Sequence, residues 1–206
     1  MTEKLDPPIH PGEILQEDLL NGFGVVTLPT ELPRLRGVSV VLRAFDERDV
    51  DLVVSVASDP LIPLVTSVPT SGSKHDATAY IERQHSRLAA GAGFSFAIAD
   101  VHPDEAVGQI GLWLGDIQEG RASIGYWIAP QFRRRGYARA ALSTLTEWAL
   151  TQDEVHRVQL LVEPGNEGSW RTAEACGYVR EGLLRSWQQV GPARKDMFMY
   201  SVVKDR

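Results

Sequence analysis

The sequence GYWIAPQFRRRGYARAAL, residues 125–142, joins a strand-like segment to a helix-like segment through a short basic loop. Apolar residues dominate 122–129, as in a half-buried strand, and Pro130 ends that pattern. From residue 136 to 150, small and apolar residues recur at helical spacing, which predicts an amphipathic helix. The stretch therefore predicts a strand, a loop and a helix in immediate succession.

The loop that opens this helix is a candidate anion site. The first N–H groups of a helix have no intrahelical partner, and the helix dipole adds about half a positive charge there. Such an end suits a phosphate or pyrophosphate. Gly136 lets the backbone approach the anion, and Ala138 is small enough to keep the first turn open. A surface loop with solvated arginines is the alternative interpretation, and without a GxGxxG or P-loop lysine, dinucleotides and nucleoside triphosphates are disfavoured.

The pattern of the whole chain predicts one mixed sheet with helices packed on it, an α/β (α+β) architecture. Short turns join the strands expected at 94–99, 107–114 and 122–129, which predicts an antiparallel meander. The other strands are expected at 38–43, 158–162, 178–184 and 197–203. The helices are expected at 46–58, 76–90, 136–150 and 169–176, with a loop at 59–73.

The chain of 206 residues has the length and composition of a single soluble domain, which excludes a disordered, collagenous or coiled-coil protein. Residues 1–33 hold six acids and one base between prolines and glycines. We interpret 1–33 as an acidic N-terminal arm with one short helix at about 12–20, and 34–206 as the domain. The net charge of −6 argues against nucleic acid as a partner.

Composition also limits cofactors and location. One cysteine and five histidines without HExxH-like spacing predict no metal site. No apolar run approaches the roughly 20 residues that a membrane span needs, and the first residues are unlike a signal peptide. We expect a cytoplasmic protein without membrane contact. The sequence allows a homodimer without requiring one.

Two motifs resemble those of a known family. Residues 125–142 resemble the pantetheine-binding segment of the GNAT acetyltransferases, and 133–138 fit its loop pattern [QR]-x-x-G-x-[GA]. Residues 156–185 are similar to the RimJ/RimL-like branch of that family, the ribosomal-protein N-acetyltransferase type. The residues that carry the second resemblance are Asn166, Ser169, Gly177, Tyr178, Arg180, Glu181 and Gly182. The resemblance covers roughly 33–203.

The resemblance implies a GNAT acyl-CoA N-acyltransferase fold, whose sheet is splayed between its fourth and fifth strands with helices on both faces. It implies acetyl-CoA as co-substrate, with pantetheine lying between strands 122–129 and 158–162. Backbone N–H groups at Trp127, Ile128 and Ala129 would bind pantetheine and polarise the thioester carbonyl. The residues implied to hold the pyrophosphate are Arg133, Arg134, Arg135, Gly136, Tyr137 and Ala138.

The candidate catalytic residues are Ser169 and Glu163. The resemblance makes Ser169 the candidate that protonates the departing thiolate and Asn166 a cofactor contact, although either residue also suits a helix cap or turn. The sequence departs from the branch where an acid is common, because Ser123 and Gln188 occupy those places. Glu163, at the end of a strand, remains as a base, acting directly or through water. A solvent-facing strand-end acid and a water chain ending on backbone carbonyls are the alternatives.

These residues predict an N-acetyltransferase that moves an acetyl group directly from acetyl-CoA to a primary amine. The acceptor would be a protein N-terminus or a small amine. The missing acids keep an alternative from another class, a catalytically weak acyl-CoA-binding sensor or regulatory module that uses the arm as a partner contact.

Overall fold

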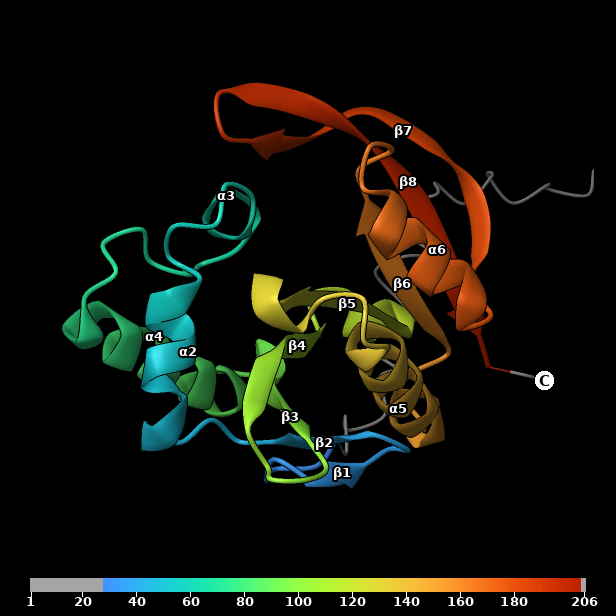
Figure 1. Ribbon diagram of the computed structural model, residues 1–206. Coiled ribbons are helices and arrows are strands. Elements are labelled where there is room, and N and C mark those ends of the chain that lie inside the picture. The colour runs from blue at the N-terminus through green and yellow to red at the C-terminus, as the bar shows by residue number, and fades with distance from the viewer. Residues whose placement is uncertain (1–27, 205–206) are drawn as a thin grey trace, which may run out of the picture.

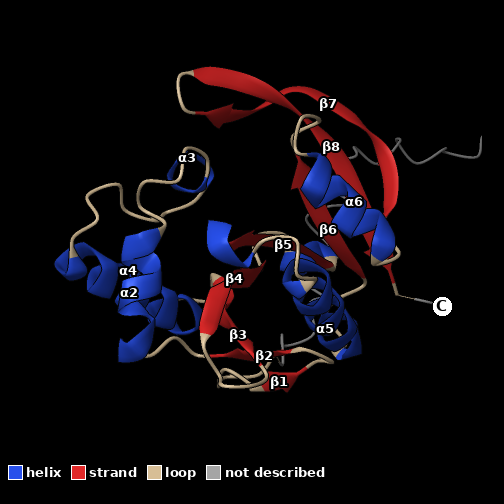
Figure 2. Cartoon of the chain, in the orientation of Figure 1, coloured by secondary structure: helices blue, strands red, loops and turns tan. Residues whose placement is uncertain are grey.

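A computed structural model describes residues 28–204, and these form one eight-stranded sheet flanked by helices (Figures 1 and 2). The strands are β1 (Leu35–Arg36), β2 (Val40–Arg43), β3 (Gly93–Asp100), β4 (Ala106–Trp113), β5 (Arg121–Ile128), β6 (Arg157–Val162), β7 (Val179–Val190) and β8 (Ala193–Val203). The helices are α2 (Val50–Ser55), α3 (Ile62–Val65), α4 (Lys74–Ala89), α5 (Tyr137–Thr151) and α6 (Glu167–Ala175), with 3₁₀ turns η1 (Glu47–Asp49), η2 (Ile117–Glu119) and η3 (Pro130–Phe132).

The sheet has the strand order β1-β2-β3-β4-β5-β6-β8-β7, and its neighbours are antiparallel except for β5 and β6. The parallel β5–β6 pairing spans three residue pairs, ending at Ser123 and Gln159. Beyond that point β5 continues beside β4 to Ile128, while β6 continues beside β8 to Val162. The two strands therefore splay apart, as predicted for segments 122–129 and 158–162.

Helices cover both faces of the sheet (Figure 1). On one face, α5 packs Leu142 and Leu145 against inward-pointing residues of β3 and β4 such as Phe96 and Ile110. On the other face, a second core joins α2 and α4 to the opposite side of the strands. Trp127 belongs to this second core, so successive residues of β5 serve the two faces alternately. The predicted architecture is confirmed.

Several boundaries differ from those expected. The helix expected at 46–58 is the turn η1 followed by α2, which ends at Ser55, and the expected loop at 59–73 contains α3. Asp59 explains α3, because its carboxylate accepts hydrogen bonds from the N–H groups of Leu61 and Ile62 and so caps that turn. The arm helix expected at 12–20 lies outside the described residues.

The last two strands are longer than predicted and form a projecting hairpin (Figure 1). Register shifts beside Gly182 and between Leu184 and Gln188 break the alternation that would have marked β7 as a continuous strand. The hairpin turns at Gly191, whose position lies against Leu64 of α3. The hairpin and α3 thus approach each other across the open side of the splay.

A buried ion pair fixes the start of the domain. The guanidinium of Arg43, at the end of β2, donates to both carboxylate oxygens of Asp49 at 2.7 and 3.0 Å. Asp49 also accepts from the N–H of Asp46, which closes a capping box over η1. Arg43 and Asp49 are 4% and 3% exposed, and Arg43 also donates to the carbonyls of Ala44 and Asp104, so Asp49 is the main but not the sole acceptor of the buried guanidinium.

A second ion pair, on the β6–β8–β7 side of the sheet, makes stability depend on pH. Arg157 of β6 pairs with Glu181 of β7, and Ser201 of β8 also donates to that carboxylate. These hydrogen bonds lower the pKa of Glu181 from 4.5 to about 2. A depressed carboxylate pKa stabilises the folded state above the ordinary pKa, and the contribution is lost as pH falls from about 4.5 toward 2.

Glu181→Gln should therefore lower the free energy of unfolding at pH 7 by about 1 kcal/mol or less, because the side chain is partly exposed and screened. Denaturant titrations of wild type and variant across pH 2–7 measure the difference. We expect it to shrink as pH falls through the range from 4.5 to 2. A difference that stays constant over that range would show that the ionised carboxylate contributes nothing specific.

Candidate active site

Backbone groups of β5 face the splay at alternate residues. Ala129 donates its N–H to the carbonyl of Val107 at 2.9 Å, so its N–H points to β4. The register that pairs Trp127 with Gln109 gives Trp127 the same direction, and Gly108 packs so tightly here that a Cβ would lie 2.2 Å from the Trp127 carbonyl oxygen. The N–H groups of Tyr126 and Ile128 therefore point the other way, toward the splay. Among the three predicted backbone contacts, Ile128 has the suitable direction.

The predicted anion loop opens α5 at the end of this strand. Gly136 is the N-cap residue of α5 with φ of 84°, a left-handed conformation that favours glycine, and no side chain caps this end. The first N–H groups of α5, which include those of Tyr137 and Ala138, therefore have no intrahelical partner. A Cβ at Gly136 would meet nothing within 4 Å. This end of α5 is open to an anion, and it remains a predicted pyrophosphate site.

The three loop arginines have different surroundings. Arg133 donates to the carbonyl of Ile128 at 3.0 Å and to the carboxylate of Asp59 at 2.8 Å. Burial alone would raise the pKa of Asp59, but hydrogen bonds from the N–H groups that it caps and from Arg133 hold it below its usual value. Arg134 and Arg135 are exposed, and within the described part of the chain neither forms an ion pair. Their guanidinium groups are the ones available to a phosphate.

Tyr137 anchors the same helix end to the sheet. Its hydroxyl donates to the carboxylate of Asp100 at the end of β3. This hydrogen bond raises the pKa of Tyr137 and lowers that of Asp100. The side chain of Tyr137 is thus used within the protein, and its backbone N–H is the part directed to the anion site.

Asn166 and Ser169, the two predicted residues at the start of α6, have different roles there. Asn166 is the N-cap, since its side-chain oxygen accepts from the N–H of Ser169 at 3.2 Å. The alternative interpretation of Ser169 as the N-cap is wrong, because the helix begins two residues earlier, at Glu167. The Ser169 hydroxyl instead forms a hydrogen bond of 2.9 Å with the hydroxyl of Tyr126 across the splay. Burial raises the pKa of Tyr126, so this phenol stays protonated and can hold Ser169 in place.

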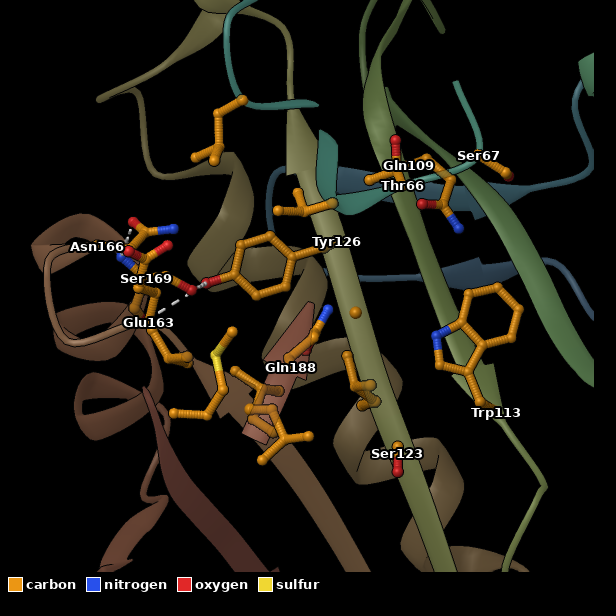
Figure 3. Close-up of a pocket in the computed structure, with 18 of the residues that line it drawn as sticks. Thr66, Ser67, Gln109, Trp113, Ser123, Tyr126, Glu163, Asn166, Ser169 and Gln188 are labelled. Atoms are coloured by element: carbon orange, nitrogen blue, oxygen red, sulfur yellow. Dashed lines mark hydrogen bonds between the residues drawn. The ribbon is translucent and has the colours of Figure 1, made fainter. Parts of the chain in front are cut away.

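A cavity of about 500 Å³ occupies the splay and its mouth (Figure 3). Glu163, Asn166 and Ser169 line it on the side of β6 and α6. Gln109 and Trp113 of β4 line it on the other side of β5, as Figure 3 shows. The cavity therefore reaches both faces of β5, and the structure brings the candidate catalytic residues together in it.

Three polar positions of this cavity bear on the identity of the general base: Glu163, and the two places where the family commonly has an acid, Ser123 and Gln188. Glu163 lies 3.3 Å from the ammonium of Lys195 on β8. Ser123 accepts a hydrogen bond of 3.1 Å from Gln159, where β5 and β6 begin to separate. Gln188 lines the same cavity, so the two positions where the resemblance predicts acids both face it. Glu163 is the one carboxylate in the described lining, and its role as a base remains a prediction.

Sequence reasoning gave no role to Tyr126 or to Gln109, although both line the cavity. Tyr126 lies within residues 125–142, with which the sequence analysis began, but its hydrogen-bond partner Ser169 is 43 residues away. Gln109 could have been found as a polar residue in a strand otherwise made of glycine and apolar residues. Polar side chains at such positions are buried only when hydrogen bonded, and they often mark a site.

Two further findings concern the described residues, 28–204. They contain no group of three or more histidine, cysteine or acidic side chains placed to hold a metal ion. None of their helices is both long and apolar enough to cross a membrane.

Comparison with known sequences identifies the family. Residues 39–179 match the acetyltransferase (GNAT) domain, and the chain belongs to this family of acetyltransferases. An uncharacterized N-acetyltransferase, p20, from Bacillus licheniformis is 26% identical over 80% of this chain and 93% of its own length. A putative ribosomal N-acetyltransferase, YdaF, from Bacillus subtilis is 35% identical over 47% of this chain and 53% of its own length.

Solved structures show the same fold. RimJ from Mycobacterium smegmatis, in complex with a CoA disulfide, superposes with a TM-score of 0.71 at 23% identity, over 85% of this chain and 89% of RimJ. RimL, a ribosomal L7/L12 α-N-protein acetyltransferase in complex with coenzyme A, gives 0.71 at 18% identity, over 83% of this chain and 98% of RimL. The predicted GNAT fold and family are confirmed, and these relatives agree with the RimJ/RimL-like branch.

Proposed function

We propose that this protein transfers the acetyl group of acetyl-CoA to the α-amine of a polypeptide. The observation that carries the proposal is the splay: a strand edge with free N–H groups, continuous with an uncapped helix end and a cavity. Acetyl-CoA fits these features, because its pantetheine arm can pair with a strand edge and its pyrophosphate with a helix N-terminus. Family membership and the CoA complexes of RimJ and RimL support the same co-substrate.

Each side of the splay has a proposed task. The first-turn N–H groups of α5, with Arg134 and Arg135, hold the pyrophosphate. The N–H of Ile128 donates to the thioester carbonyl, where negative charge develops during attack by the amine. Acetyl-CoA supplies an activated acetyl group that leaves its thiol behind. Ser169, held by Tyr126, delivers a proton to that sulfur, and Glu163 accepts the amine proton directly or through water.

The charge of the cavity favours a polypeptide over a polyamine or an aminoglycoside. Polyamines carry several cations, and buried or enclosed cations need carboxylate partners. Glu163 is already paired with Lys195, and Arg87 adds a positive charge to the lining. The lining also includes exposed apolar side chains, with Leu61 and Val65 at 39% and 41% exposure. A polypeptide N-terminus, which has a single α-amine followed by side chains that can contact apolar residues, suits this cavity.

The test is a panel of acceptors with acetyl-CoA, measured by release of free thiol. We expect a peptide with a free N-terminus to be acetylated and its N-formyl counterpart not to react at the N-terminus, because it has no free amine there. Spermidine should react at least about tenfold more slowly than the free-amine peptide. Preference for spermidine would contradict the choice of acceptor. Binding of acetyl-CoA without transfer to any amine would favour the acyl-CoA sensor, which the absence of acids at Ser123 and Gln188 supports.

Ser169→Ala should lower kcat about 100-fold without changing the affinity for acetyl-CoA, since loss of a proton donor to a thiolate is at the low end of general-acid effects. Ser143→Ala is the matched control, because Ser143 lies on α5 and contacts Cys176 rather than the cavity. Steady-state kinetics with direct binding measurements separates the two. Equal kcat values for the two variants would remove Ser169 from the chemistry.

A further inference from the structure

A chain of buried polar side chains crosses from α4 to the wall of the cavity. Gln84 of α4, Ser95 of β3 and Gln109 of β4 are 3%, 4% and 5% exposed. Ser95 bonds to the Oε1 of Gln84 at 3.0 Å, and the Nε2 of Gln109 bonds to the Oγ of Ser95 at 3.1 Å. Buried polar chains in an apolar core are costly unless they are fully bonded, so the orientation of each member carries information.

The first link is fixed by an arginine. Arg87 donates its Nε–H to the Oε1 of Gln84 at 2.9 Å, and a guanidinium has no acceptor. The atom of Gln84 that faces Arg87 and Ser95 must therefore be the oxygen. The other end of the same amide agrees, because its Nε2 donates to the carbonyl of Tyr80 at 3.2 Å.

The orientation then passes to Gln109. Since the Gln84 oxygen can only accept, the single hydroxyl hydrogen of Ser95 is donated to it. The Ser95 oxygen must then accept from its second partner, which makes that partner the amide nitrogen of Gln109. The Oε1 of Gln109 is left pointing away from Ser95, and no donor among residues 28–204 is bonded to it. Gln109 lines the cavity, so this oxygen is an unpartnered acceptor in its wall.

Gln109, which carries this oxygen, lies close to the part of β5 that borders the splay. Gln109 lies opposite Trp127 in the β4–β5 register, next to Ile128, whose N–H points into the splay. On the face of β5 that Gln109 shares, the residues are Ser123, Gly125 and Trp127. Because Gly125 has no side chain, no β5 side chain lies between Ser123 and Trp127 on that face, and the indole of Trp113 packs over the glycine instead. Figure 3 shows Gln109 beside β5, across the strand from Ser169.

We infer that the Oε1 of Gln109 accepts a hydrogen bond from the acceptor amine and orients it toward the thioester. The inference rests on the proposed function and assigns the contact that positions its nucleophile. An amide oxygen does not take up a proton at neutral pH, so Gln109 binds and orients the amine and leaves deprotonation to another group. Ser95 acts through Gln109 as a positioning residue.

The test uses Gln109→Met, which keeps the length of the side chain and removes the oxygen. We expect kcat/KM for a free-amine peptide to fall about tenfold, as for loss of one hydrogen bond. The affinity for acetyl-CoA, and its slow hydrolysis by water without peptide, should stay as in wild type. A general structural defect would change both of those readouts.

Ser95→Ala provides the matched test of the relay. It should lower kcat/KM for the peptide less than Gln109→Met does, and the double variant should be no worse than Gln109→Met alone, because both act through one contact. Values within twofold of wild type for Gln109→Met would overturn the inference. A wild-type enzyme that acetylates no peptide would overturn the proposed function as well, and that result is visible before any variant is made.

Discussion

Replacing Gly136 with aspartate should weaken acetyl-CoA binding about 100-fold, because a carboxylate would then stand in front of the N–H groups proposed to hold the pyrophosphate. The variant should remain folded. Aspartate is among the residues that tolerate the left-handed conformation, and an acid at a helix N-terminus is favourable. Isothermal titration with acetyl-CoA measures the affinity, and thermal unfolding checks the fold.

Gly177→Asp is the matched control. Gly177 has nearly the same backbone conformation, with φ of 81° against 84°, and a Cβ there also meets nothing within 4 Å. It follows the C-terminal end of α6, where aspartate opposes the helix dipole. This control should lose some stability and keep its affinity for acetyl-CoA. If both variants bound as well as wild type, the end of α5 would not be the pyrophosphate site.

Asp49→Ala should lower the free energy of unfolding by about 3 kcal/mol, because it leaves the Arg43 guanidinium buried without its two-pronged partner. The same change removes the acceptor of the Asp46 N–H and so opens the capping box of η1. The carboxylates of Asp104 and Asp46 each lie 3.3 Å from the Arg43 guanidinium, but Asp104 contacts Nε and Asp46 contacts Nη1, so neither replaces both bonds to Asp49. Denaturant titration at neutral pH measures the loss.

The matched control for this change is Asp51→Ala. Asp51 lies two residues further on and pairs with Lys74 at 2.8 Å, but both side chains are about three-quarters exposed. Exposed pairs contribute little, so this variant should lose less than about 1 kcal/mol. Similar losses in the two variants would mean that burial does not decide the value of the Arg43–Asp49 pair.

Local patterns predicted those parts of the fold that depend on neighbouring residues. Apolar segments joined by short turns identified the meander of β3, β4 and β5, and helical spacing identified α5 to within one residue at each end. Asn166 and Ser169 are both good capping residues and lie three positions apart, so the sequence did not determine which of them is the N-cap of α6. Which one caps depends on where the backbone leaves the helical conformation.

The site depends on contacts between distant residues, which local patterns do not encode. Arg133 pairs with Asp59, 74 residues away, so its guanidinium is less available to a phosphate than those of Arg134 and Arg135. Ser169 meets Tyr126 because α6 packs beside the splay. The direction of each β5 N–H group follows from the pairing with β4, and this narrows the thioester contact to Ile128.

Acetyl transfer to an α-amine is tested most directly by following both products of one reaction. Enzyme, acetyl-CoA and a free-amine peptide are incubated, and thiol release is compared with acetyl-peptide quantified by mass spectrometry. We expect one acetyl-peptide per thiol released, with the acetyl group on the α-amine. Thiol release that is the same with and without peptide, or an acetyl group found on side chains instead, would contradict it.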